Sequence, residues 1–276
     1  MKKFPEKRVV ITGAGSGLGR ALALEFAKLG WRILIADINR DRAHETAFLV
    51  NKAGGKGLAV RCDVTKWEQV KKLADRAVLA WGGVDIIVNN AGVPVVGVME
   101  DVPIKDWRWE IDINLMGPVH GCKAFIPVLK KQGYGHIVNV ASGAGFVSLA
   151  EMGPYSATKA AVISLSETIR MELANKNIGV TVVCPTFFKT NLLDQARYTD
   201  DKQLKRAEGF FRLSLGSAEG VSRHIIRSIR KNRLYVITQP DAKLYWFMKR
   251  HMPNFYSRMM SFLFNRGILD KVLGVK

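Results

Sequence analysis

The sequence predicts an α/β fold, a doubly wound parallel sheet in a single domain with a C-terminal helical extension. Short β-branched runs alternate with helix-length segments from residue 8 to residue 190. Turns rich in Gly or Asn separate them, and apolar residues recur three and four apart in the longer segments. Because each crossover helix must pack its apolar stripe back onto the sheet, we expect helices on both faces.

Six runs have the length and composition of buried strands. The first is followed by a helical segment from Arg20 to Leu29. Beyond Thr190 the alternation weakens into a polar, irregular stretch over residues 194–206, then a helical segment over 217–232 and a short strand over 234–238. The six strand candidates are Arg8–Ile11, Arg32–Asp37, Gly57–Arg61, Ile86–Asn89, Gly135–Val140 and Val180–Cys184.

The chain divides by composition into a domain over residues 1–240 and an extension over residues 241–276. With 276 residues, 48% of them hydrophobic, the domain can bury a core without disulfides or a structural metal. Cys62, Cys122 and Cys184 lack metal-ligand spacing, so we expect free thiols in a reducing compartment and no metal site. The N-terminus lacks a long apolar run, and no stretch reaches the roughly 18 apolar residues of a spanning helix, which favours a cytoplasmic protein.

The positive charge is concentrated near the C-terminus. The chain carries 42 Lys and Arg against 24 Asp and Glu, a formal net charge of +18. Residues 202–276 hold sixteen Lys or Arg and four Asp or Glu, a net +12 that leaves +6 for the first 201 residues. Nucleic acid, an anionic membrane surface and a merely basic soluble protein are all compatible with that excess.

A glycine-rich loop follows the first strand. It reads Thr12-Gly13-Ala14-Gly15-Ser16-Gly17-Leu18-Gly19 and leads into a helix. Such glycines let the backbone approach a pyrophosphate, whose charge is met by the N–H groups at the helix N-terminus. The spacing departs from plain G-x-G-x-x-G and is also compatible with a methyltransferase loop or with a tight turn without ligand. The loop predicts a nucleotide without saying which one.

Asp37 ends the second predicted strand, twenty residues after Gly17. A carboxylate there can bond both hydroxyls of an adenosine ribose and repel a 2′-phosphate. This favours NAD over NADP, although Arg40 and Arg42 lie close enough to keep NADP open. The alternative is an ordinary solvated Asp at a strand end.

Tyr155 and Lys159 lie four residues apart, which places them on one face of a helix. A phenol with a pKa near 10 is a poor base at neutral pH, and a neighbouring ammonium stabilises its phenolate. Ser142 follows the strand that ends at Val140, where ligands of open α/β sheets bind. Its hydroxyl is placed to hold a substrate oxygen.

Taken in order, these motifs make residues 7 to 190 resemble the classical short-chain dehydrogenases/reductases, which have a Rossmann-like fold. The loop over residues 12–19 is similar to the family's TGxxxGxG, and Asn89-Asn90-Ala91-Gly92 is similar to its NNAG motif. One departure is Thr186 after Pro185, where the family usually has Gly. The family's catalytic tetrad is matched by Asn114, Ser142, Tyr155 and Lys159.

This resemblance implies an oxidoreductase that transfers a hydride reversibly between a nicotinamide and a secondary alcohol or ketone. Tyr155 would be the acid/base, Ser142 would orient the substrate oxygen, and Lys159 would lower the Tyr155 pKa and bind the nicotinamide ribose. Asn114 would hold a water that links Lys159 to solvent. The implied cofactor site comprises Gly13, Ser16, Gly17, Leu18, Gly19, Asp37, Asp63, Val64, Asn90, Ala91, Gly92, Tyr155, Lys159, Phe188 and Thr190.

The resemblance also implies a homodimer or homotetramer and a substrate lid around residues 190–216. An apolar lid fits a hydrophobic substrate such as a retinoid, steroid or acyl chain, unless these side chains are ordinary core. The alternative function is a cofactor-binding regulatory or scaffold protein on the same fold without turnover. The apolar residues expected around the substrate are Phe146, Val147, Leu149, Met152, Phe210, Phe211, Leu213 and Leu215.

The extension interleaves aromatic and Met side chains with cations. Residues 244–248 read LYWFM and precede Lys249 and Arg250, and residues 255–264 read FYSRMMSFLF. An interfacial amphipathic helix has this composition, which predicts peripheral contact with the inner face of a membrane. Packing on the core or on another subunit is the alternative. Nucleic acid is not expected, because no reading module is recognisable.

Overall fold

The computed structural model describes residues 4–188, 190–214 and 216–275, without the side chains of residues 213, 240, 241 and 269. Its centre is a seven-stranded sheet in the order β3-β2-β1-β4-β6-β7-β9, and all six neighbouring pairs are parallel. The doubly wound parallel sheet is therefore confirmed. The strands are β1 (Arg8–Thr12), β2 (Arg32–Asp37), β3 (Lys56–Arg61), β4 (Ile86–Asn89), β6 (Gly135–Val140), β7 (Ile178–Cys184) and β9 (Tyr235–Ile237).

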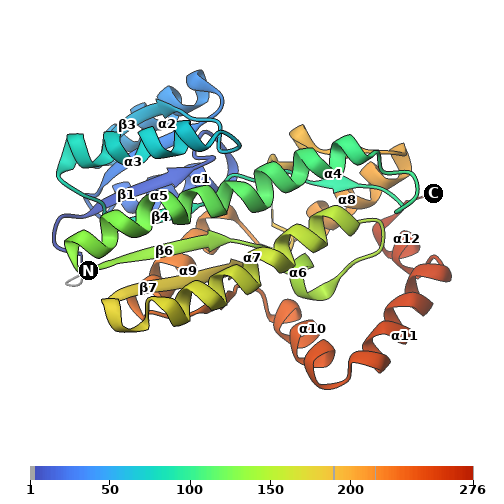
Figure 1. The fold of residues 1–276 in the computed structure, drawn as a ribbon. Coiled ribbons are helices and arrows are strands. Elements are labelled where there is room, and N and C mark those ends of the chain that lie inside the picture. The colour runs from blue at the N-terminus through green and yellow to red at the C-terminus, as the bar shows by residue number, and fades with distance from the viewer. Residues whose placement is uncertain (1–3, 189, 215, 276) are drawn as a thin grey trace.

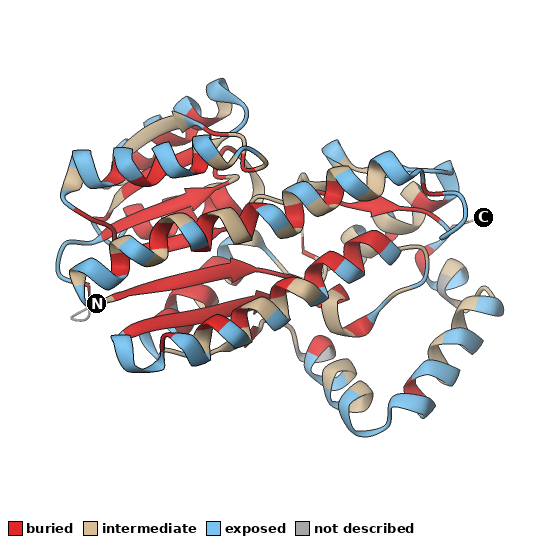
Figure 2. Ribbon diagram, in the orientation of Figure 1, coloured by how far each residue is buried: buried red, intermediate tan, exposed pale blue. Residues whose placement is uncertain are grey.

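Helices cover both faces of this sheet (Figure 1). One face packs against α1 (Gly17–Ala27), α2 (Arg40–Lys52) and α9 (Ala218–Arg230). The other face packs against α3 (Trp67–Trp81), α5 (Gly117–Gln132) and α7 (Gly153–Glu172). The central strands are consequently buried along their length, as Figure 2 shows.

Three elements differ from the sequence prediction. Short strands β5 (Val95–Val96) and β8 (Arg197–Tyr198) pair with each other outside the main sheet. The polar stretch expected to be irregular contains the start of α8 (Asp201–Leu213). Its helix begins where the Asp200 carboxylate accepts the Lys202 N–H, a capping interaction that outweighs the low apolar content.

The extension forms three helices, α10 (Pro240–His251), α11 (Pro253–Asn265) and α12 (Ile268–Leu273). Pro253 lies in the first turn of α11, where a missing N–H costs nothing, so the chain turns sharply between α10 and α11. In Figure 1 these helices form a V that starts beside the short helix α6 (Ala144–Val147) and returns towards α8, while the helix α4 (Ile104–Ile111) lies above them in the view. Among the described residues, no helix combines the length and apolarity needed to cross a bilayer.

A buried ion pair ties the start of β1 to the segment that precedes β4. Asp85 is fully buried, and its carboxylate accepts the Arg8 backbone N–H at 2.8 Å and the Arg8 guanidinium at 3.0 Å. We expect Asp85→Ala to lower the free energy of unfolding by about 3 to 5 kcal/mol, because it leaves a buried guanidinium uncompensated. Chemical denaturation measures this loss.

Glu6→Ala is the matched control, since it breaks the solvent-exposed pair between Glu6 and Arg32. Its cost should stay below about 1 kcal/mol. Equal losses for the two variants would contradict a structural role for the Arg8–Asp85 pair.

Candidate active site

The carboxyl ends of β1, β4 and β6 meet at one edge of the sheet, because these strands are neighbours and run parallel. The glycine loop, the Asn90-Ala91-Gly92 segment and Ser142 follow those three ends. The glycine loop and the Asn90-Ala91-Gly92 segment open onto a cavity of about 270 Å³. It is lined by Gly13, Ser16, Gly17, Leu18, Asp37, Asp63, Val64, Asn90, Ala91, Gly92, Tyr155, Lys159, Phe188 and Thr190, all of which the sequence had nominated for the cofactor.

The glycine loop needs its glycines for space and for backbone shape. Gly13 and Gly17 have φ values of +61° and +52°, in the region that L side chains rarely adopt. A Cβ on Gly19 would overlap the carbonyl oxygen of Gly13. Gly19 accordingly supports the loop from behind and does not line the cavity. The Asn90 side-chain amide donates to the Thr12 and Gly13 carbonyls at 3.0 Å each, which fixes the loop against the end of β4.

Asp37 lies at the far end of this cavity. One carboxylate oxygen accepts the Gly15 N–H at 2.8 Å, and the other accepts the Asn39 N–H at 2.9 Å. Two backbone donors hold the side chain at the strand end, so its negative charge has a defined position. Arg42 also lines the cavity, close to that charge.

Tyr155, Ser142 and Lys159 converge at the other end. Lys159 Nζ donates to the Val140 carbonyl at 3.0 Å and lies 5.6 Å from the centroid of the Tyr155 ring. Burial raises the pKa of Tyr155 to about 12, partly offset by its hydrogen bond with Ser142. Burial also lowers the pKa of Lys159 to about 8. At pH 7 the phenol is therefore protonated, and the lysine is still mostly an ammonium.

Asn114 lies behind these groups in a π-helical segment, Asp112–Met116. Its side-chain oxygen accepts the Val93 N–H at 2.9 Å, and its amide donates to the Val93 carbonyl at 2.8 Å. The amide also donates to Glu110 at 2.9 Å. The side chain thus fastens the segment after β4 to the end of α4, and the water expected on Asn114 stays a prediction.

Glu110 is the residue that sequence reasoning missed. It is fully buried, and its second carboxylate oxygen has no hydrogen-bonding partner in the part of the chain that the structure describes. Burial raises its pKa to about 8, opposed by the nearby Lys159 ammonium. The one available signal was its position a helical turn before Asn114.

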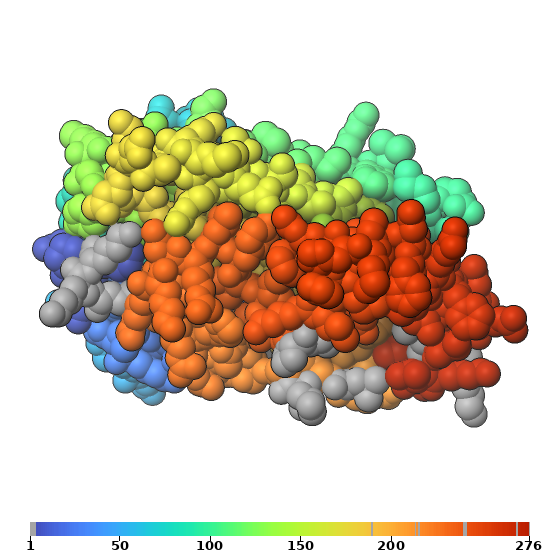
Figure 3. All heavy atoms as spheres, turned by 90° about the horizontal axis from the view of Figure 1, so that it is seen from below, coloured from blue at the N-terminus to red at the C-terminus, as the bar shows by residue number. Residues whose placement is uncertain are grey.

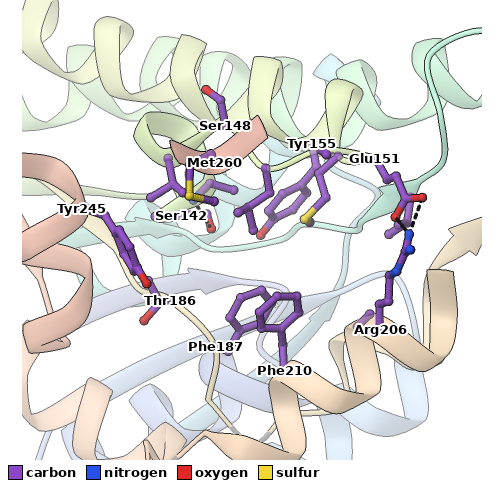
Figure 4. Close-up of a pocket in the computed structure, with 18 of the residues that line it drawn as sticks. Ser142, Ser148, Glu151, Tyr155, Thr186, Phe187, Arg206, Phe210, Tyr245 and Met260 are labelled. Atoms are coloured by element: carbon purple, nitrogen blue, oxygen red, sulfur yellow. Dashed lines mark hydrogen bonds and ion pairs between the residues drawn. The ribbon is translucent and has the colours of Figure 1, made fainter. Parts of the chain in front are cut away.

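A second cavity, of about 610 Å³, adjoins the first, and Tyr155 lines both. Its walls are mostly apolar, and Figure 4 shows Phe187 and Phe210 facing Tyr155 across it. The two Phe rings stack with centroids 4.5 Å apart. Ser142 also lines this cavity, as do the expected Val147, Leu149, Met152, Phe210 and Phe211.

The other nominated apolar residues fall elsewhere. Phe146 packs in the core cluster that contains Cys184 and does not line this cavity. Leu215 and the side chain of Leu213 lie outside the described parts of the chain. The sequence placed Phe146 in the lining of the substrate site, and it could not tell on which side of the short helix α6 this side chain lies.

The extension closes this cavity, which the sequence did not show. Tyr245, Tyr256, Met260 and Phe264 line it from α10 and α11. At one end Arg206 of α8 pairs with Glu151 at 2.6 Å and with Asp270 of α12 at 2.5 Å (Figure 4 shows the Glu151 pair). The Arg206 pairs join three segments that are distant in sequence around the cavity.

Comparison with known proteins agrees with this geometry. Residues 7–201 match the family model of the short chain dehydrogenases. The chain belongs to the classical short-chain dehydrogenase/reductase family. The SadH protein of Mycobacterium tuberculosis, named as a putative oxidoreductase, is 34% identical to this chain over 265 residues, covering 95% of this chain and 96% of SadH.

Two further relatives carry more specific names. The CLA biosynthesis dehydrogenase/reductase of Lactiplantibacillus plantarum is 30% identical, over 87% of this chain and 91% of its own length. Epidermal retinol dehydrogenase 2 of Mus musculus is 37% identical, over 67% of this chain and 62% of its own length. Among solved structures, a short-chain dehydrogenase/reductase from Burkholderia phymatum in complex with NAD superposes with a TM-score of 0.87 at 34% identity, covering 92% of this chain and 96% of that one.

Glu110→Gln should change how stability depends on pH. Because the pKa of Glu110 is raised to about 8, folding favours the protonated form, and the wild type loses stability as pH rises from about 5 to about 8. Gln does not titrate. The stability of the variant relative to the wild type should therefore increase across this range and level off above pH 8, as measured by denaturant midpoints at pH 5, 7 and 9.

Glu100→Gln, at an exposed position, is the control and should show no such trend. If the stability difference between Glu110→Gln and the wild type were constant with pH, the Glu110 carboxyl would not be buried as the structure has it.

Proposed function

We propose that the protein is an NAD-dependent dehydrogenase/reductase of apolar secondary alcohols and ketones. The observation that carries the proposal is the position of Tyr155, which lines both the nucleotide cavity and the apolar cavity. A group at this junction can exchange a proton with a substrate oxygen on one side while a cofactor is bound on the other.

The first cavity fits a dinucleotide. A Cβ on Gly17 would meet the Thr190 hydroxyl at 2.8 Å, and one on Gly13 would meet Ala91 Cα at 2.7 Å, so the glycines keep open the space that a pyrophosphate needs. The Asp37 carboxylate is held where a ribose hydroxyl pair would be bonded, which supports NAD over NADP. When bound, NAD supplies the hydride acceptor at its nicotinamide C4, and NADH the donor.

Tyr155 and Ser142 supply the groups that act on the substrate oxygen. Since the pKa of Tyr155 is raised to about 12, the phenol is an acid at neutral pH and can donate to a developing alkoxide during ketone reduction. In the direction of alcohol oxidation it must first lose that proton. The Ser142 hydroxyl lies within hydrogen-bonding reach of Tyr155, and its one O–H can turn to donate to the same substrate oxygen and orient it.

Lys159 supports this proton transfer electrostatically. Its ammonium lies near the Tyr155 ring, in an environment where water screens little, so it favours the phenolate when Tyr155 gives up its proton. Burying a lysine lowers its pKa and costs free energy. A protein that only bound the cofactor could use Lys159 on the nicotinamide ribose but would not need Tyr155 beside it, which argues against the regulatory or scaffold alternative.

The second cavity favours an apolar substrate. Its volume of about 610 Å³ falls within the range typical of small-molecule sites, and aromatic, Leu, Val and Met side chains form most of its wall. One of the relatives carries a name that refers to an apolar alcohol, epidermal retinol dehydrogenase 2. These observations support a retinoid-, steroid- or acyl-like alcohol or ketone as substrate.

Tyr155→Phe should lower kcat for an apolar alcohol by about 10²- to 10⁴-fold, because the variant keeps the ring and loses the proton. NADH binding, measured by quenching of Trp fluorescence, should change little. Tyr198→Phe, at an exposed tyrosine, is the control and should keep wild-type turnover. Undiminished turnover in Tyr155→Phe would refute the mechanism.

Asp37→Ser should shift the cofactor preference towards NADP. The variant removes the charge that repels a 2′-phosphate and leaves Arg42 to attract it, so the ratio of kcat/KM for NADPH to that for NADH should rise at least about tenfold, the equivalent of about 1.4 kcal/mol. The control is Asp41→Ser, an exposed carboxylate of α2 that does not line the cavity. A wild type that prefers NADPH would contradict the role assigned to Asp37.

A further inference from the structure

Helix α11 has two chemically different faces. Pro253, Tyr256, Met260 and Phe264 recur three to four residues apart and line the apolar cavity. Tyr256 is buried, and its hydroxyl donates to the Val147 carbonyl at 2.8 Å, which anchors this face to α6. The inward face alone accounts for how the helix packs on its own chain.

The opposite face exposes large apolar side chains. We use the term outer face for the exposed residues between positions 243 and 266, in α10, α11, the turn between them and the end of α11, that do not line the cavity. Its apolar members are between 44% and 57% exposed, and they come from both helices and from the turn between them. Exposed apolar side chains gathered in one region mark an interaction surface. They are Leu244, Phe247, Met252, Phe255 and Phe262.

Cations lie among these side chains, and acids are missing. No Asp or Glu occurs from residue 242 to residue 269. Lys243, Arg250, Arg258 and Arg266 are exposed on the outer face, and none of them forms an ion pair with any residue that the structure describes. The Arg266 guanidinium lies 5.5 Å from the centroid of the Phe262 ring, so charge and aromatic surface are adjacent.

We propose that the outer face binds the surface of an anionic lipid bilayer. Aromatic and Met side chains would enter the boundary between headgroups and acyl chains, while the four cations meet lipid phosphates. A second copy of the chain fits this face poorly, because a symmetric contact would bring the unpaired cations of both copies together. Nucleic acid would use the charges but leave the aliphatic side chains exposed.

The outer face lies close to the apolar cavity, so membrane binding would bring the bilayer near that cavity. Figure 3 shows the orange and red C-terminal quarter spread over one side of the molecule, and the inward side of the same helices is the wall of the apolar cavity. A bilayer bound there would be one helix thickness away from the proposed substrate site. This last consequence rests on the proposed function, whereas membrane binding itself does not.

The test is cosedimentation of the full-length protein with two kinds of vesicle. One kind is phosphatidylcholine alone, and the other is phosphatidylcholine with about 30% phosphatidylglycerol, which makes the surface anionic. The wild type should bind the anionic vesicles at least about tenfold more strongly, and raising the salt to about 0.5 M should remove most of the difference. Two double variants separate the contributions, Phe255→Ser with Phe262→Ser and Arg258→Gln with Arg266→Gln. Each should weaken binding to anionic vesicles by about tenfold or more.

Matched controls lie on α3, away from the extension in Figure 1. Leu79→Ser removes an exposed apolar side chain, and Lys71→Gln with Lys72→Gln removes two exposed cations; neither should change vesicle binding. NADH binding and the thermal midpoint of all variants check that the fold is intact. The arginine double variant changes only exposed polar groups, so it tests the proposal even if the aromatic double variant is unstable.

Three results would overturn the proposal. One is a wild type that fails to bind anionic vesicles; another is outer-face double variants that bind as tightly as the wild type. The third is a dimer, seen by sedimentation velocity, that dissociates in Phe255→Ser with Phe262→Ser. Because vesicle binding is measured without turnover, a failure here is distinguishable from a failure of the proposed dehydrogenase activity.

Discussion

In a parallel sheet all carboxyl ends of the strands lie at one edge, and the chemistry of this protein depends on that constraint. β1, β4 and β6 are neighbours in the sheet although far apart in sequence. The order and direction of these strands are enough to place the glycine loop, the Asn90 segment and Ser142 at the same edge of the sheet. The buried ion pair between Arg8 and Asp85 links the amino-terminal ends of β1 and β4. The same two strands therefore contribute both to the stability of the sheet and to the geometry of the site at their carboxyl ends.

Exclusion of water then sets the properties of the groups at this edge. Tyr155, Lys159 and Glu110 are all buried, and burial is the largest cause of each pKa shift. Each shift favours the neutral form. The ammonium and the carboxyl partly offset one another, since each charge stabilises the charged form of the other. At pH 7 Tyr155 and Glu110 are therefore mostly neutral and Lys159 is mostly charged, in a place where the transfer of a proton has large electrostatic consequences.

The extension combines two roles in one pair of helices. Its inward side completes the apolar cavity, and the Arg206 pairs with Glu151 and Asp270 join it to α8 and to the segment after α6. Its outward side exposes aromatic side chains such as Phe255 and Phe262 together with cations such as Arg258. The high net charge of the chain is concentrated in residues 202–276, and part of it lies on the outer face of α10 and α11.

The sequence by itself determined the sheet, the nucleotide loop and the Tyr155–Lys159 pair, because these depend on local periodicity, glycine spacing and i,i+4 geometry. It did not determine α8, which begins with a capping box formed by Asp200 and Gln203, or the buried Glu110, which accepts a hydrogen bond from Asn114. The wall that α11 adds to the substrate cavity was likewise decided by tertiary structure. Which face of a helix turns inward depends on what lies opposite, and residues far apart in sequence meet there only after the chain has folded.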